Sequence, residues 1–332
     1  MKAILLSRTG DPSVLDYVEV PTPRPKANEV LVKADTIGVS RPELLVRKGT
    51  YQWMPPLPAI PGIEMAGTVV ELGAGVTALS VGQKVYVSAR ELPVRAGCYA
   101  EYIAVPERAP FALPADADLE AAACLSNYQV AWHLLHTATR GVPGKTVLIG
   151  QASGGLGSAA VELARLAGMT AIALVGTVEK ARALKAHGAD HIIDYSAEDV
   201  GARVKAITEG EGVDLVLDSA GGPGLARYLD MLAPFGQVVS YGRLQGPPEA
   251  NVVTALENGP GYLNSGAFRV FTMHTLDDKP ELRAQSMNDL IARLGEGRIR
   301  PLIHARLKLK DARVAHEMLE TRAVIGKVLL KP

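Results

Sequence analysis

The pattern of apolar and polar residues changes character after about the first third of the chain. Over the first 120 residues the apolar runs are short and separated by Gly and Pro, which is typical of β-strands joined by tight turns. The strands expected here are Met1–Leu6, Glu29–Ile37, Gly67–Leu72, Lys84–Ser88 and Tyr99–Val105. This part of the sequence predicts a compact antiparallel or barrel-like module.

Beyond it, apolar strands alternate with helical patterns, beginning with an Ala-rich helix over Leu119–Ala138. The strands expected next are Thr146–Ile149, Thr170–Val175, His191–Ile193, Val213–Leu217 and Gln237–Tyr241. The helices expected between them are Gly155–Ala167, Val178–His187, Asp199–Thr208 and Gly222–Leu232. Helical crossovers between apolar strands indicate a doubly wound parallel sheet.

The alternation loosens after Tyr262. Two further helices, Pro280–Leu294 and Lys310–Glu320, and a final strand, Lys327–Leu330, are expected there. A chain of 332 residues, at roughly 150 residues per domain, suggests two domains. The predicted fold class is α/β.

Composition excludes several classes of function. The 35 basic and 35 acidic residues balance, and aromatics make up only 5%, which argues against nucleic-acid binding. No run of 18 apolar residues predicts a membrane span, and the apolar run at the N-terminus is too short for a signal peptide. Cys98 and Cys124 are the only cysteines, so a disulfide scaffold and a four-thiolate zinc site are excluded. We expect a cytoplasmic protein.

A glycine-rich turn carries the clearest chemical signal. It joins a predicted strand to an amphipathic helix and fits the G-x-G-x-x-G fingerprint as Ala152-x-Gly154-x-x-Gly157. Gly154 would let the backbone approach a pyrophosphate, Gly157 would let helix and strand pack closely, and the helix N-terminus supplies N–H donors. The turn therefore predicts a dinucleotide site.

The next strand distinguishes between the two nicotinamide cofactors. NAD sites usually place an acidic residue at its tip, where it binds the ribose diol. Here the strand ends in Val175-Gly176-Thr177, and Lys180 follows one turn later. A hydroxyl and a lysine suit a 2′-phosphate, so NADPH is favoured.

Several further motifs together make a family resemblance. They are Glu43-x-x-x-Arg47-x-Gly49-x-Tyr51, Pro61-Gly-Ile-Glu64-x-x-Gly67, Gly97-Cys-Tyr-Ala-Glu-Tyr102, the glycine turn, and Asp218-Ser219-x-Gly221. With them the chain resembles the zinc-independent quinone oxidoreductase branch of the medium-chain dehydrogenase/reductase superfamily over essentially its whole length. The resemblance implies a GroES-like catalytic domain from residues 1–122 and 265–332. A Rossmann NADPH-binding domain, residues 123–264, would lie between these segments.

The resemblance also implies the cofactor residues. Residues matching Ser153, Gly154, Gly155 and Leu156 hold the pyrophosphate, and Gly157, which ends the fingerprint, is also assigned to the cofactor site. Lys180, Tyr195 and Arg322, with Thr177, would surround the 2′-phosphate. The Ser240–Gly242 stretch, with Tyr241 and Gly242, lies near the nicotinamide, and Ser219 is also assigned to the cofactor site.

No metal is expected. Zinc-dependent members carry His in a G-H-E motif, but this chain has Ile63 there, and no cysteine occurs near Gly38–Arg41. Both ligands of a tetrahedral N/S site are therefore missing.

The acceptor side departs from the quinone reductases of the branch. They usually carry Asn at Ser40, Asp at Glu43 and Thr at Val130. Asn127 falls where related 2-enoyl thioester reductases have the Asn of an Asn-Pro-x-Thr motif, here without its Pro and Thr. We assign Ser40, Tyr51 and Asn127 as catalytic candidates. Tyr51 either donates a proton or only lines the pocket.

The chemistry expected is hydride transfer from NADPH to a small electrophilic acceptor, a quinone or another conjugated acceptor. A 2-enoyl thioester or enone (alkenal) reductase is the alternative, and a non-catalytic NADPH-binding structural protein is a third reading. Arg41, Arg47 and Lys48 are either solvated surface charges or an attraction for an anionic substrate. Relatives of this branch are commonly homodimers joined through their Rossmann sheets, and the Gln237–Tyr241 strand is a plausible edge.

Overall fold

The computed structural model describes residues 1–142, 144–247, 251–321 and 323–332. They form two compact units, one made of Met1–Ser126 with Met287–Pro332 and the other of Asn127–Ser286. None of the described helices combines the length and apolarity that a membrane span needs.

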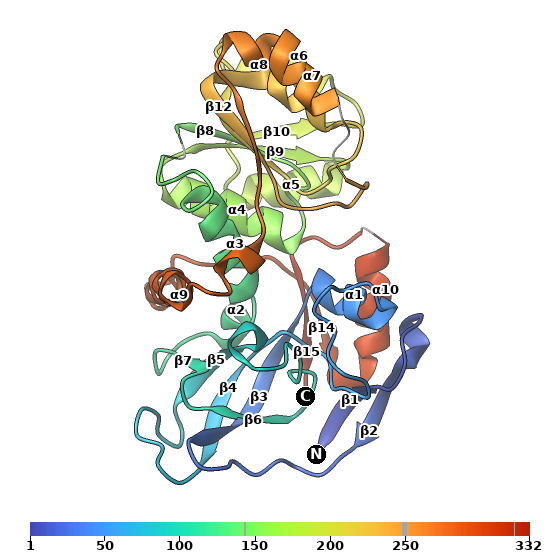
Figure 1. The fold of residues 1–332 in the computed structure, drawn as a ribbon, viewed down its shortest axis with the longest axis vertical. Helices are drawn as coiled ribbons and strands as arrows, with labels where there is room; N and C mark the ends of the chain where they lie inside the picture. The colour runs from blue at the N-terminus through green and yellow to red at the C-terminus, as the bar shows by residue number, and fades with distance from the viewer. Residues whose placement is uncertain (143, 248–250, 322) are drawn as a thin grey trace. The chain divides into compact units, whose positions relative to one another are not determined.

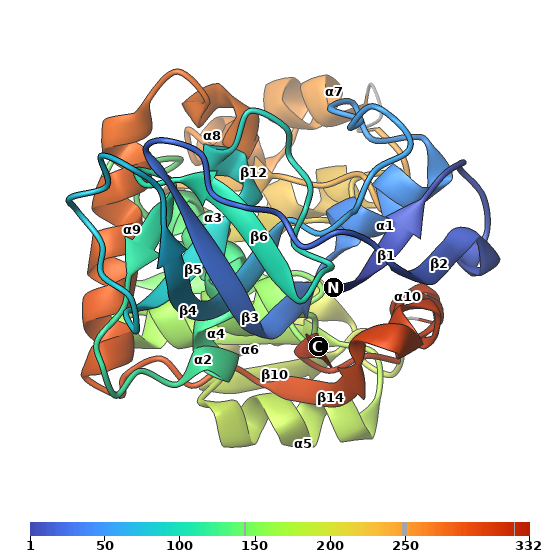
Figure 2. The ribbon, with the colours of Figure 1, turned by 90° about the horizontal axis from the view of Figure 1, so that it is seen from below.

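Among the described residues, the first unit is built on a seven-stranded sheet and a separate β1-β2 hairpin. Six strands of the sheet follow the order β14-β15-β3-β4-β5-β7, and the seventh, β6, pairs with β3. Strands β3, β4, β5 and β6 lie side by side in Figure 2. Its strands are β1 Lys2–Leu6, β2 Leu15–Glu19, β3 Glu29–Val39, β4 Glu64–Leu72, β5 Lys84–Ser88, β6 Tyr102–Pro106, β7 Pro110–Ala112, β14 Ile303–Lys308 and β15 Lys327–Lys331. Its helices are α1 Arg41–Lys48, α2 Leu119–Ala122 and α10 Ala312–Glu320, with short 3₁₀ helices η1 Pro12–Val14, η2 Ala89–Glu91 and η5 Leu309–Asp311.

The second unit contains a six-stranded parallel sheet of order β10-β9-β8-β11-β12-β13. Helices α4 and α5 lie on one side of this sheet and α6, α7 and α8 on the other (Figure 1). Its strands are β8 Thr146–Ile149, β9 Thr170–Val175, β10 His191–Asp194, β11 Val213–Asp218, β12 Leu232–Ser240 and β13 Ala267–Val270. Its helices are α4 Gly155–Leu166, α5 Val178–His187, α6 Val200–Ile207, η3 Leu225–Met231, α7 Asn251–Asn258, α8 Pro260–Leu263 and η4 Met273–Leu276. Helices α3 Leu125–Leu135 and α9 Pro280–Gly295 each contain a unit boundary.

This strand order places a switch point between β8 and β11. The chain leaves β8 in one direction across the sheet, through β9 and β10, and then returns to the other side of β8 at β11. In doubly wound sheets ligands bind where the order reverses, beyond the carboxyl ends of the strands. The fold therefore points to the residues that follow β8 and β11.

Three sequence expectations need correction. The second unit ends at Ser286 rather than at 264, because β13 pairs with β12 and so belongs to the parallel sheet. β12 is for the same reason no edge, and β10 and β13 are the outer strands among the described residues. The helix expected over Gly222–Leu232 is only the 3₁₀ segment η3, after two residues with positive φ, Gly221 and Gly222.

Candidate functional site

The glycine turn contains two glycines in different surroundings. A Cβ on Gly157 would lie 2.5 Å from the Gln151 carbonyl oxygen and 2.6 Å from Cα of Ala152. A Cβ on Gly154 would have one neighbour, the same Gln151 oxygen, at 3.8 Å. Gly157 is thus where α4 packs on the turn, and the backbone at Gly154 is open to a ligand, as the fingerprint leads one to expect.

Helix α4 presents donors to this open side. Gly154 is its N-cap, and the Ser158 N–H donates to the Gly154 carbonyl over 2.9 Å. The N–H groups of Gly155, Leu156 and Gly157 precede this bond, and such groups at a helix start have no carbonyl partner within the helix. Ser153 comes directly before the cap and is 8% exposed. The turn therefore offers backbone donors and a helix dipole to an anion.

The residues expected at a 2′-phosphate meet around the end of β9. Thr177 is the N-cap of α5, and its hydroxyl accepts a hydrogen bond from the Lys180 backbone N–H at 3.3 Å. A Cβ on Gly176 would lie 2.6 Å from the Tyr195 hydroxyl, so this phenol lies over the strand tip. Arg322, the fourth candidate, lies outside the described residues.

A buried carboxylate organises the ends of β11 and β12. Asp218, 1% exposed, accepts hydrogen bonds from the Ala220 N–H at 3.1 Å, the Gly221 N–H at 2.9 Å and the Ser240 hydroxyl at 3.2 Å. Burial raises the pKa of its carboxyl. These bonds fix the turn that carries Ser219.

Ser219, Tyr241 and Gly242 come together at this turn. The Tyr241 N–H donates to the Asp218 carbonyl at 2.8 Å, and a Cβ on Gly242 would lie 2.3 Å from the Ser219 carbonyl oxygen. With the turn after β8 and the tip of β9, they lie at the carboxyl edge of the sheet. All described cofactor candidates therefore share one edge.

In the first unit, Ser40 lies in a buried polar network that sequence reasoning missed. The Ser40 hydroxyl accepts a hydrogen bond from the Lys327 ammonium and lies 3.3 Å from Glu64 Oε1. The sheet register explains the meeting: Val328 of β15 pairs with Val39 of β3, so Lys327 and Ser40 follow at the end of that ladder. Lys327 also pairs with Glu64, and the two side chains are 3% and 0% exposed.

The Glu64 carboxylate has further partners. It accepts hydrogen bonds from the Ser126 hydroxyl at 2.7 Å, the Ser126 N–H at 3.0 Å and the Tyr86 hydroxyl at 3.2 Å. A buried charge of this kind is stable only when its partners are complete. Glu64 and Lys327 therefore form a buried ion pair whose carboxylate is held by further hydrogen bonds.

Glu43 is the second buried carboxyl of the network. It accepts hydrogen bonds from the Ser40 and Ile63 backbone N–H groups, both at 3.2 Å. Burial and, to a lesser extent, repulsion by Glu64 raise the pKa of its carboxyl to about 8, although Lys327 opposes the rise. Glu43 is therefore mostly protonated at neutral pH. The sequence contains a signal for the position of Glu43, because Ser40-x-x-Glu43 before a helix is a capping-box pattern.

The three catalytic candidates do not form one described cluster. Ser40 precedes α1 and Tyr51 follows its C-cap, so the two lie at opposite ends of a helix roughly 12 Å long. The half-buried Tyr51 ring packs 5.7 Å from the Trp53 ring. Asn127 is half-buried in α3 and is the first residue of the second unit.

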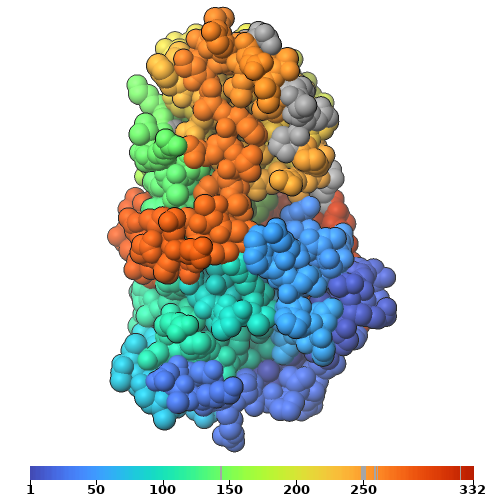
Figure 3. Space-filling model, viewed as in Figure 1, coloured from blue at the N-terminus to red at the C-terminus, as the bar shows by residue number. Residues whose placement is uncertain are grey.

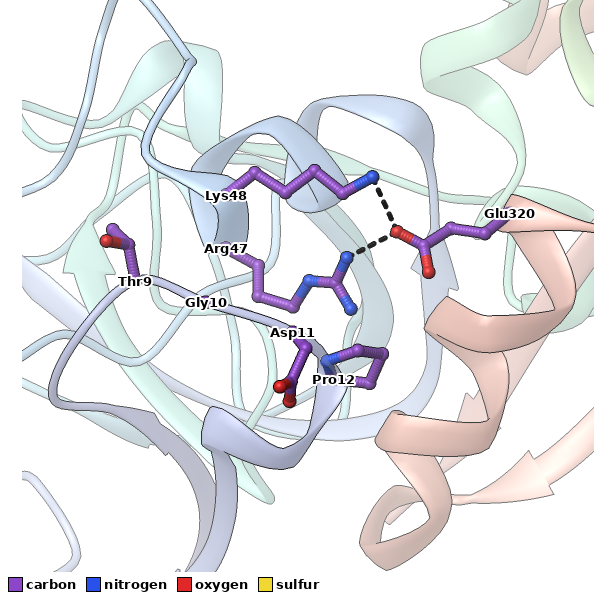
Figure 4. Close-up of a pocket in the computed structure, with 7 residues that line it drawn as sticks. All are labelled: Thr9, Gly10, Asp11, Pro12, Arg47, Lys48 and Glu320. Atoms are coloured by element: carbon purple, nitrogen blue, oxygen red, sulfur yellow. Dashed lines mark hydrogen bonds and ion pairs between the residues drawn. The ribbon is translucent and has the colours of Figure 1, made fainter.

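Of the basic group, Arg41 at the start of α1 and Lys48 at its end are exposed, and only Arg47 is buried. Arg47 is 1% exposed and pairs with Glu320 of α10, and Lys48 pairs with the same carboxylate at 2.7 Å (Figure 4). They line a pocket of about 370 Å³ with the Thr9–Pro12 loop. Because Asp11 and Glu320 also line it, its two cations face two carboxylates. This balance does not favour an anionic substrate.

Both cysteines behave as buried apolar residues. Cys98 and Cys124 are 0% and 1% exposed, and burial raises the pKa of both thiols. A thiol whose pKa is raised in this way is a poor nucleophile and a poor metal ligand.

Known proteins share this architecture. Residues 26–115 match the alcohol dehydrogenase GroES-like domain, and residues 187–330 match the family described as zinc-binding dehydrogenase. The quinone oxidoreductase of Pseudomonas aeruginosa is 33% identical over 333 residues, covering 100% of this chain and 99% of the relative. The chain belongs to the quinone oxidoreductase branch of the medium-chain dehydrogenase/reductase superfamily.

Two further proteins extend the comparison. The structure of Escherichia coli quinone oxidoreductase complexed with NADPH aligns over 100% of both chains, with a TM-score of 0.86 and 30% identity. The 2-haloacrylate reductase of a Burkholderia species is 30% identical over 338 residues, covering 99% of this chain and 98% of the relative. The predicted family, the GroES-like and Rossmann fold, and the assignment as an oxidoreductase are confirmed.

Proposed function

We propose that this protein transfers hydride from NADPH to a quinone without the help of a metal ion. The observation that supports this proposal most directly is at the carboxyl edge of the parallel sheet. An open glycine turn and a helix N-terminus lie there beside a strand tip without a carboxylate. Escherichia coli quinone oxidoreductase, a protein of the same architecture, was crystallised with NADPH.

NADPH is the hydride donor. Gly176 and Thr177 end β9, and Lys180 and Tyr195 lie next to them, so this position offers hydroxyl groups and a cation. A ribose 2′-phosphate accepts hydrogen bonds from such groups, whereas the bare diol of NADH is usually bound by an acid. Arg322 completes the proposed set.

Hydride transfer without metal fits the first unit. Ile63 replaces the G-H-E histidine, the Ser40 hydroxyl is engaged by Lys327, and the two thiols are held protonated by burial. Among the residues that the structure describes, no three His, Cys, Asp or Glu side chains group as metal ligands do. A quinone needs little polarisation, because it is already electrophilic, and the nicotinamide supplies the chemistry. Tyr51 and Asn127 remain candidates for contact with the acceptor.

Steady-state NADPH oxidation with a panel of quinones, enones and crotonyl-CoA tests the proposal. We expect turnover with quinones, and the same rate after dialysis against a strong chelator. Turnover with alkenes alone would favour the alternative, a conjugated-alkene reductase, which the similarity to 2-haloacrylate reductase supports. Tight NADPH binding without turnover of any acceptor would contradict both enzymatic functions and favour the structural role.

Lys180→Glu tests the cofactor assignment. Reversing this charge should weaken NADPH by at least tenfold and NADH far less, because only NADPH carries the 2′-phosphate. Fluorescence titration of both cofactors measures the two dissociation constants. Lys205→Glu, in the last turn of α6 at the opposite sheet edge, is the matched control for net charge. Equal losses for both cofactors would contradict the assignment.

We also propose that the protein is a cytoplasmic homodimer joined through β13. This outer strand carries Val270, 61% exposed, and Phe235 nearby is 83% exposed. Residues 251–270 include Tyr262 and Leu263 at 68% and 83% exposure and are seen in orange in Figure 3. An unpaired strand edge with apolar neighbours suits pairing with a second copy. Light scattering should give twice the 35.1 kDa of one chain.

A further inference from the structure

The Ser40 hydroxyl lies between a cation and an anion. The Lys327 ammonium donates to both Ser40 Oγ and Glu64 Oε1, and these two oxygens are 3.3 Å apart. Ser40 is 7% exposed, more than Lys327 at 3% or Glu64 at 0%. All three residues are buried, and Ser40 is the most exposed of them.

The hydroxyl proton of Ser40 is only weakly held. Glu64 already accepts from Lys327, from the Ser126 hydroxyl and N–H, and from the Tyr86 hydroxyl. A carboxylate has about four acceptor positions, so Ser40 is a fifth donor. Its 3.3 Å distance is the longest of the set and well beyond the usual 2.7–2.8 Å of an O–H···O bond.

Lys327 also changes the hydroxyl electronically. An oxygen that accepts a hydrogen bond from a cation becomes a stronger donor through its own O–H, because the two bonds polarise each other. In a buried site, with little competing water, this polarisation is larger than at a surface. Ser40 is thus a polarised donor with no strong acceptor of its own.

We propose that Lys327 positions and polarises the Ser40 hydroxyl as a hydrogen-bond donor to the acceptor oxygen that gains negative charge during hydride transfer. This inference rests on the proposed function. The C–H bond at nicotinamide C4 breaks, its electron pair forms the new bond to hydrogen on the acceptor, and NADPH becomes NADP⁺. The charge that reaches the acceptor oxygen is stabilised by the Ser40 O–H, which keeps its proton, and that oxygen takes its proton from water.

Lys327 is accordingly a positioning residue, and Ser40 is the catalytic one. A preorganised donor to a developing oxyanion typically contributes a factor of about 10²–10³ in kcat. Loss of this donor should lower kcat and leave cofactor affinity unchanged, because the donor acts on the charge that forms in the transition state.

The test is a mutant cycle that leaves no buried charge alone. Its members are Ser40→Ala, the paired change Glu64→Gln with Lys327→Met, and the triple variant. We expect Ser40→Ala to lower kcat with a quinone by about 10²-fold with NADPH affinity unchanged. The paired change should lower kcat by about tenfold, and the triple variant should equal Ser40→Ala, because Lys327 acts only through the hydroxyl.

Other outcomes would overturn the inference. They are an unchanged kcat in Ser40→Ala, a loss confined to KM, or losses that multiply in the triple variant. Ser40→Thr keeps the hydroxyl and should recover most of kcat, whereas a purely structural role predicts no recovery. If none of the acceptors supports NADPH oxidation by the wild type, the proposed function fails, and the inference fails with it. A fully active Ser40→Ala beside an active wild type removes the inference alone.

Discussion

The two candidate regions are formed by different chemical groups, backbone in one and side chains in the other. In the second unit the cofactor edge is mainly backbone: the turn from Gly154 to Gly157 excludes side chains at one position and leaves room at another. In the first unit the proposed acceptor side is made of titratable side chains: the Glu64–Lys327 ion pair and the mostly protonated Glu43, all buried around Ser40. The cofactor edge offers backbone N–H groups to an anion, and the proposed acceptor side pairs a buried cation with a buried carboxylate.

This difference determines how each region fails. A backbone site is lost when an added side chain fills the space, and the damage depends on which glycine is changed. A network of buried charges is lost when one partner is removed, because the remaining charge has no water to replace it. The predictions below separate these two kinds of failure.

Removing Lys327 alone should have the largest effect. Lys327→Met leaves Glu64 buried without its cation, and breaking a buried pair costs about 3–5 kcal/mol of unfolding free energy. The paired change Glu64→Gln with Lys327→Met should cost much less, since no charge is left alone. Chemical denaturation of both variants measures the contrast. Equal stability of the two would show that the pair is solvated and not a closed network.

The two glycines of the turn provide a matched pair. Gly157→Ala should lower the unfolding free energy by about 1–3 kcal/mol, because its Cβ would overlap the Gln151 carbonyl. Gly154→Ala should leave stability nearly unchanged and weaken NADPH about tenfold, because its methyl group enters the space proposed for the pyrophosphate. Thermal unfolding and cofactor titration test both variants. If Gly154→Ala is the less stable one, the roles assigned to these glycines are reversed.

The most gradual effect is the pH dependence of stability that Glu43 produces. Its pKa is raised from 4.5 to about 8 on folding, so the native state binds an extra proton between these values. This contribution to stability is complete below pH 4.5 and is lost as pH rises through about 8. Between pH 5.5 and 8.5 the wild-type Tm should fall, relative to Glu43→Gln, by on the order of a few °C. Parallel Tm curves would contradict the shift.

Much of the fold follows from local pattern. The strands at Lys84–Ser88, Thr146–Ile149 and Thr170–Val175 and helix α5 have the bounds expected from the sequence, since each is a continuous apolar or amphipathic run. The Leu119–Ala138 pattern is instead two helices, α2 and α3, separated at Ala123–Cys124. Strand β13 was missed because Ala267–Val270 is short and exposed, and only its pairing with β12 makes it a strand.

The candidate sites differ in how far a sequence can predict them. The glycine turn is continuous, so residues 153–157 carry the whole signal. The Ser40 network joins residues 40–43, 64, 126 and 327, which are far apart in the sequence and meet only in the folded unit. The sheet register accounts for the meeting of Ser40 and Lys327. A lysine at the start of an apolar strand has no local reason to be buried, so neither its pairing with Glu64 nor its bond to Ser40 could be predicted.

The strand tip at Gly176 limits how the cofactor preference can be engineered. An acid introduced at position 176 to attract NADH would have to displace the Tyr195 side chain, because its Cβ would lie 2.6 Å from the Tyr195 hydroxyl. Position 177 is free of that conflict but caps α5. Asp is as good an N-cap as Thr, so Thr177→Asp keeps the helix start while it adds the carboxylate that a ribose diol prefers. In this protein the economical route to a changed cofactor is therefore the residue that begins the helix.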